Sequence, residues 1–177
     1  MNEITDLDVT GLVSKKSGNI LGDAHEHFVV AVMMRLGFEV AITELSAGPY
    51  DCLIVVYNDF YNQKHDSSKD LLRVQIKTAR KSLPLTGGGR AGIDRIYNTD
   101  ETEDKTYKYT SDIVDLIIGV DKYTLDIYIV PAIYAEEWGS SKSLNLLQPL
   151  KNKWNILLNW NSDYINKLKY ELPDFKE

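Results

Sequence analysis

Apolar and polar residues first alternate with a helical period. The segment 22–37, "GDAHEHFVVAVMMRLG", places apolar side chains three and four residues apart, which predicts a helix with one apolar face. Asp23 is a plausible N-cap, and Gly37 is a typical residue just beyond a helix C-terminus. The expected apolar stripe consists of Phe28, Val29, Val32, Met33 and Leu36.

Strand-like runs follow the helix. The runs 38–44, 51–58 and 71–79 predict three strands, the last two forming a hairpin. The runs 113–120 and 124–131 predict a further pair that turns near Asp121 and Lys122 and ends at Pro131, before a short helix over 132–138. Between these groups, 85–92 is expected to be flexible and 99–104 to be a solvated acidic loop. The order predicts an α/β fold with a mixed central β-sheet flanked by helices.

The chain length of 177 residues suits one domain. We expect a polar arm over 1–19 and a single domain over 20–177, with a helical extension from about 151, where apolar and aromatic residues again recur with a helical period. The apolar runs are too short to span a bilayer, and the N-terminus carries no secretory signal pattern. The single cysteine, Cys52, lies in an apolar run and fits a reducing cytosol, so we expect a buried thiol and a cytoplasmic protein without membrane contact.

Four polar residues interrupt these apolar elements. Gln75 and Lys77 share one face of the third strand, because residues two apart point the same way. Asp51 opens the second strand, and Glu26 lies on or beside the apolar stripe of the helix. A buried carboxylate is costly unless it is paired or binds a metal. Two carboxylates, an amide oxygen and a lysine at one end of a hairpin are typical of a Mg²⁺ site.

The same residues resemble a known signature. "GPYD", a strand and then "VQIK" is similar to the motif of PD-(D/E)XK nucleases, with Pro49, Asp51, Gln75 and Lys77 at the motif positions. The glutamate of "GDAHE" looks like one that the first core helix of this family often supplies. "VQIKTAR", "IVDLIIGV" and "LDIYIVP" resemble the cyanobacterial-type group I intron homing endonuclease branch, over roughly residues 20 to 135.

This resemblance implies a restriction-endonuclease-like core and metal-dependent hydrolysis of DNA, with Mg²⁺ as cofactor and Mn²⁺ as a possible substitute. Asp51 would be the central metal ligand, joined by Glu26, the amide oxygen of Gln75 and the carbonyl of Ile76. Lys77 would orient or activate the attacking water. Most of the superfamily has an acid where this chain has Gln75, whereas the homing-endonuclease branch that the chain resembles usually has Gln there. Cleavage of both strands would require a homodimer or homotetramer.

Charge is unevenly distributed. The net charge is −6, but residues 73 to 95 hold six basic residues and one acid, a local charge of +5. The remainder therefore carries −11, since −6 minus +5 is −11. A basic patch suits the phosphates of double-stranded DNA, and the expected contacts are Arg80, Lys81 and Arg90.

Other interpretations remain open. Lys77 could extend to solvent from a strand edge, Gln75 could bond a backbone group, and Asp51 could be an ordinary turn residue. His25 and His27 are two apart on a helix and diverge, so solvated histidines are expected. Alternative functions are a restriction, repair or junction-resolving nuclease of the same fold, a non-catalytic DNA-binding module, or an interaction protein that uses the acidic remainder.

Overall fold

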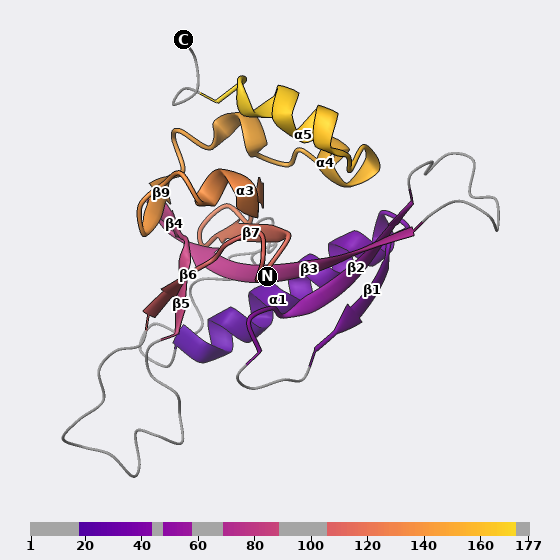
Figure 1. Cartoon of the computed structure of the whole chain (residues 1–177). Coiled ribbons are helices and arrows are strands. Elements are labelled where there is room, and N and C mark those ends of the chain that lie inside the picture. Colours follow the sequence, from indigo (N-terminus) through magenta and orange to yellow (C-terminus); the bar gives the residue numbers. More distant parts are fainter. Residues whose placement is uncertain (1–17, 44–47, 58–68, 89–105, 173–177) are drawn as a thin grey trace, which may run out of the picture.

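The computed structural model describes residues 18–43, 48–57, 69–88 and 106–172 (Figure 1). In these ranges the helices and strands are α1 (Gly18–Arg35), β1 (Glu39–Ile42), β2 (Cys52–Tyr57), β3 (Lys69–Ala79), β4 (Ser82–Pro84), β5 (Thr86–Gly88), β6 (Thr106–Lys108), β7 (Leu116–Asp121), β8 (Ile127–Pro131), α3 (Ala132–Ala135), β9 (Ser141–Ser143), the 3₁₀ helix η2 (Gln148–Leu150), α4 (Asn155–Leu158) and α5 (Ser162–Lys169). No helix among the described residues is both long enough and apolar enough to cross a membrane.

A five-stranded mixed sheet forms the centre of the fold. Its order is β1-β2-β3-β7-β8, with β3 and β7 parallel and the other neighbours antiparallel. Two small two-stranded sheets, β4–β9 and β5–β6, lie beside it. The predicted α/β class with a mixed sheet is confirmed, as are the β2–β3 hairpin and the β7–β8 pair.

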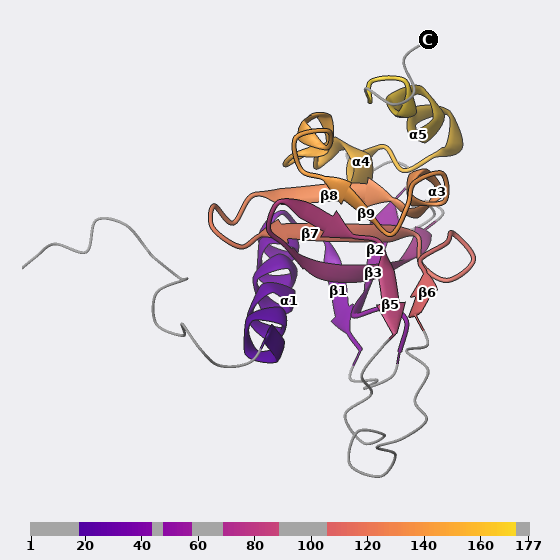
Figure 2. The ribbon, with the colours of Figure 1, turned by 90° about the vertical axis from the view of Figure 1, so that its left-hand side faces the viewer.

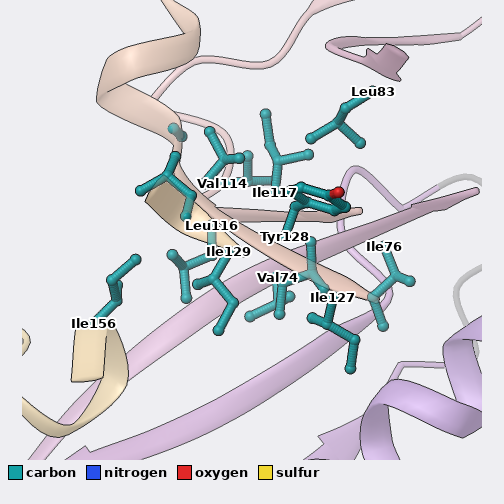
Figure 3. Packing of buried hydrophobic residues seen from close by; sticks show 14 of the residues in the cluster. Val74, Ile76, Leu83, Val114, Leu116, Ile117, Ile127, Tyr128, Ile129 and Ile156 are labelled. Carbon is teal, nitrogen blue, oxygen red and sulfur yellow. The ribbon is translucent and has the colours of Figure 1, made fainter. Parts of the chain in front are cut away.

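Helices cover opposite sides of the central sheet. In both views α1 lies on one side and the C-terminal helices α4 and α5 lie on the other (Figures 1 and 2). Because both sides are covered, every residue of β8 is buried, and so is all of β7 except its last residue. On one face of the sheet, side chains of β8 pack with those of β3, as Figure 3 shows for Val74, Ile127 and Ile129. Cys52 is fully buried, as predicted.

The first helix begins earlier than the sequence predicts. It starts at Gly18, so Asp23 lies inside the helix instead of capping it, and residues 18 and 19 at the end of the predicted arm are helical. Residues 1–17, the rest of the predicted arm, lie outside the described residues. Gly37 has φ 96°, which confirms it as the residue that ends the helix. The predicted stripe is wrong at Leu36, which is 42% exposed because it follows the last turn, whereas Val30 is buried.

The middle and the C-terminal part also differ in detail from the prediction. We expected Thr86–Gly88 to be flexible, but it forms β5 and pairs with Thr106–Lys108. The sequence did not reveal this pairing because the partner strand follows only after a long gap. The acidic loop at 99–104 lies outside the described residues. In the C-terminal part the helices are α4 and α5, and the Asn161 side chain caps α5 by accepting the Tyr164 N–H at 2.8 Å.

Candidate active site

Asp51, Gln75 and Lys77 come together through the β2–β3 hairpin. The register pairs Cys52 with Val74, so Asp51, one residue earlier, stands opposite Gln75. The Asp51 backbone N–H donates to the Val74 carbonyl at 2.8 Å, which holds the two chains together at this point. Lys77 lies two residues beyond Gln75 on the same face of β3. The structure therefore brings the three predicted residues to one face of the sheet.

Hydrogen bonds fix the Asp51 carboxylate. Its Oδ2 accepts the Ile76 backbone N–H at 2.6 Å and an N–H of the Gln75 side-chain amide. The same amide nitrogen is 3.3 Å from the Ile76 carbonyl oxygen. Gln75 is only 5% exposed, so its amide is held among polar groups of the site. It therefore bridges two oxygens that the family resemblance assigns to a metal.

The charged groups of the site act on one another. Burial raises the pKa of Asp51, while the Ile76 N–H, the Lys77 charge and the Gln75 amide oppose this rise. Burial also raises the pKa of Glu26, and the negative charge of Asp51 adds to that effect. Burial lowers the pKa of Lys77, against the attraction of Asp51 and Glu26. The mutual influence places Glu26 of α1 within electrostatic reach of both strand residues.

An aromatic ring supports Lys77. The Nζ atom is 5.3 Å from the ring centroid of Tyr109, a cation–π distance. Tyr109 is buried, and its ring meets that of Tyr107 edge-to-face, with 5.5 Å between centroids and 85° between planes. Gly87 of β5 lies directly against both tyrosines, because a Cβ there would be 2.7 Å from Cζ of Tyr109. The β5–β6 pair thus holds the ring that Lys77 faces.

The expectation of two solvated histidines is wrong for His25. His25 is 3% exposed, and its Nδ1 lies 2.8 Å from the Thr78 hydroxyl on β3. Burial lowers its pKa, and the charge of Lys122 lowers it further. His27 is exposed and bonds the Asp23 carbonyl within its own helix at 2.8 Å. The spacing of His25 four residues before Val29, which is buried, was the available signal in the sequence.

No motif marks Tyr109, which sequence reasoning missed. It follows the acidic run 99–104 in a segment without a recognisable pattern, and it reaches Lys77 only through the pairing of β5 with β6. A sequence signal for this contact is absent because the two residues lie on separate elements that only the tertiary fold brings together.

The predicted phosphate contacts fall at the end of β3. Arg80 and Lys81 are exposed there, between β3 and β4. Arg90 lies outside the described residues. Arg73 contributes to the basic run in the sequence, but its Nε and NH2 groups donate hydrogen bonds to the Asp115 carboxylate, each at 3.0 Å. The Asp115 pairing raises the pKa of Arg73. Of these basic residues, Arg80 and Lys81 are exposed at the surface.

The donor set fits a hard divalent cation. Asp51 and Glu26 offer carboxylates. The Gln75 amide nitrogen donates to both Oδ2 of Asp51 and the carbonyl oxygen of Ile76, so these two oxygens lie close to the same point. Mg²⁺ is commonly held by one or two carboxylates, with waters and phosphate completing the octahedron. In the described part of the chain no three histidine, cysteine or acidic side chains form a metal-binding group. The Gln75 amide must reverse to offer its oxygen.

Comparison with solved structures finds a similar fold. A solved structure of a bacterial homing endonuclease is similar over 82% of this chain and 95% of that chain, with a TM-score of 0.61. That protein is I-Ssp6803I, and its sequence is 15% identical to this one. At this identity the similarity shows the fold. No family model and no curated protein sequence matches the chain.

Proposed function

We propose that the chain is a metal-dependent endonuclease that hydrolyses phosphodiester bonds of double-stranded DNA, with Mg²⁺ as its cofactor and Mn²⁺ as a substitute. The observation that carries the proposal is the placement of Asp51, Gln75 and Lys77 on one face of a hairpin, with Glu26 in electrostatic reach. The likeness to a homing endonuclease fold supports it.

The residues have distinct roles in this proposal. A bound divalent cation supplies Lewis-acid stabilisation of charge on the phosphate. Asp51 and Glu26 hold it with carboxylates, and the Ile76 carbonyl and the Gln75 amide oxygen complete the protein ligands. Lys77 orients the attacking water and stabilises the developing charge on the phosphate. The face of the Tyr109 ring attracts the Lys77 ammonium through a cation–π contact.

DNA contact and assembly follow from the same proposal. Arg80 and Lys81 bind backbone phosphates next to the site. Because each site cuts one strand, cleavage of both strands requires a homodimer or homotetramer, which light scattering of the purified protein would measure. Homing is the proposed role, and restriction, repair and junction resolution are the alternatives that the same site chemistry serves.

A plasmid assay tests the reaction. Supercoiled plasmid is incubated with protein and Mg²⁺ or Mn²⁺, together with Asp51→Ala, Lys77→Ala and the control Lys153→Ala. Among the described residues the Lys153 side chain pairs with Glu171 in a surface ion pair, so its loss should leave cleavage unchanged. Nicking or linearisation that needs metal and disappears in the first two variants supports the proposal. Cleavage that persists in both variants contradicts it.

A non-catalytic DNA-binding module is the second candidate. The observation that favours it is that the Gln75 amide nitrogen donates hydrogen bonds to both the Asp51 carboxylate and the Ile76 carbonyl, the oxygens that a metal would need. Such a module would retain DNA in a gel without metal and would leave it uncut at every Mg²⁺ or Mn²⁺ concentration. To exclude the absence of a rare target sequence, the substrate should be a library of random duplexes that is sequenced for cut ends.

A further inference from the structure

His25 occupies a position on α1 where an apolar residue would be expected. The buried side chains on the face that meets the sheet include His25, Val29 and Met33, which are four residues apart. On the N-terminal side, Ile20 is 58% exposed, and Asp23 and Ala24 are also exposed. Among the side chains whose burial is described, His25 is therefore the first buried anchor of the helix.

The anchor is polar and incompletely satisfied. Nδ1 bonds the Thr78 hydroxyl at 2.8 Å, while the buried Nε2 has no partner among the described residues. A buried polar atom without a partner costs stability, so this position is not the best one for packing alone. Local choices that sacrifice stability in this way are expected at functional sites.

Both partners of this bond adjoin residues of the candidate site. His25 precedes Glu26 on the helix, and Thr78 follows Lys77 on β3. Consecutive helix residues point about 100° apart, so a fixed direction for His25 fixes the direction of Glu26. A packed apolar side chain allows the helix to rotate or slide slightly, whereas a hydrogen bond is directional.

We propose that His25 and Thr78 form a positioning pair that sets the orientation of Glu26 relative to Lys77 and Asp51. The proposal rests on the proposed nuclease function and goes beyond it, because neither residue is among the proposed metal ligands or phosphate contacts. Without the bond, Glu26 and Lys77 are still present but the ligand geometry is less well fixed, which lowers metal affinity and the rate at saturating DNA.

The matched variants are Thr78→Val and Thr78→Ser. Valine keeps the shape of threonine but removes the hydroxyl, and serine keeps the hydroxyl but removes the methyl group. The first readout is the binding of Mn²⁺ alone. It is measured from the electron paramagnetic resonance signal of free Mn²⁺, at a temperature below the melting temperature of each variant. We expect Thr78→Val to weaken Mn²⁺ binding by about tenfold, as for other residues that orient ligands. Thr78→Ser should stay within about twofold of the wild type, since it retains the hydroxyl that orients the ligand.

The double variant His25→Leu with Thr78→Val separates positioning from stability. Replacing both partners of a buried hydrogen bond by apolar groups is often neutral or stabilising, so this variant should melt no lower than Thr78→Val. We expect its Mn²⁺ affinity and its maximal cleavage rate to remain low. DNA retention without metal should be unchanged, because the phosphate contacts lie elsewhere.

The outcomes distinguish the two levels of the argument. If the wild type binds Mn²⁺ through Asp51 and cuts DNA, but Thr78→Val equals Thr78→Ser in both readouts, the positioning pair is refuted and the nuclease stands. Recovery of Mn²⁺ affinity together with stability in the double variant refutes it too. If the wild type neither cuts DNA nor loses Mn²⁺ affinity on Asp51→Asn, both the proposed function and the positioning pair are overturned.

Discussion

Replacing Gly87 with alanine would place a methyl group where two tyrosine rings now lie. The new Cβ would stand 2.7 Å from Cζ of Tyr109 and 2.8 Å from Cζ of Tyr107, and nearer still to the Tyr109 hydroxyl. Because Tyr109 is 1% exposed, its ring has little room to move away. Overpacking of this kind costs about 1–3 kcal/mol. For a chain of this size that lowers the melting temperature by roughly 2–12 °C.

Function should change with stability, since the displaced ring is the one that faces Lys77 at 5.3 Å. Loss of about 1 kcal/mol of cation–π attraction would slow cleavage by roughly fivefold if it falls on the transition state. Calorimetric melting and plasmid cleavage, measured on the same preparations, check both effects.

Two further variants make the Gly87 result interpretable. Gly139→Ala is the matched control, because a Cβ there meets nothing within 4 Å, and it should melt and cut like the wild type. Adding Tyr109→Phe to Gly87→Ala removes the atom nearest to the new methyl but keeps the ring face, so part of the stability should return. A Gly87→Ala protein that melts and cuts like Gly139→Ala would refute the packing argument.

Three other changes have defined outcomes. Burial raises the pKa of Asp51, so between its unfolded and folded pKa values the folded state binds more protons and the stability of the wild type falls as pH rises. The melting temperature of metal-free Asp51→Asn should therefore increase relative to that of the wild type as pH rises through the acid range. A constant difference between the two melting temperatures would contradict this. Asp115→Ala removes the acceptor of the Arg73 backbone N–H at 2.7 Å and of its guanidinium, and should cost about 1–3 kcal/mol in urea unfolding, whereas Glu171→Ala should cost about 0–1 kcal/mol; equal losses would count against the difference. Arg80→Ala should reduce the slope of log affinity for DNA against log salt by about 1, and an unchanged slope would remove it from the phosphate contacts.

The elements of the central sheet were predictable because their signals are local. Alternation along β3 placed Gln75 and Lys77 on one face, and the hairpin with β2 brought Asp51 opposite Gln75. The start of α1 was not predictable in the same way. The first turns of α1 expose most of their side chains, so the apolar periodicity in the sequence begins only after the residue at which the helix starts. Contact of His25 with β3 helps to hold this part of the helix in place, and no local pattern shows that contact.

By itself the sequence determined which residues share a strand face and which run is apolar, because side-chain direction alternates with every residue. Only the tertiary structure decided what surrounds those residues. Tyr109 reaches Lys77 through a strand pair separated by a long segment, and Gly87 leaves the space for its ring. The Thr78 hydroxyl makes a buried anchor of His25. Contacts between distant segments depend on how whole elements pack, and no local pattern records that packing.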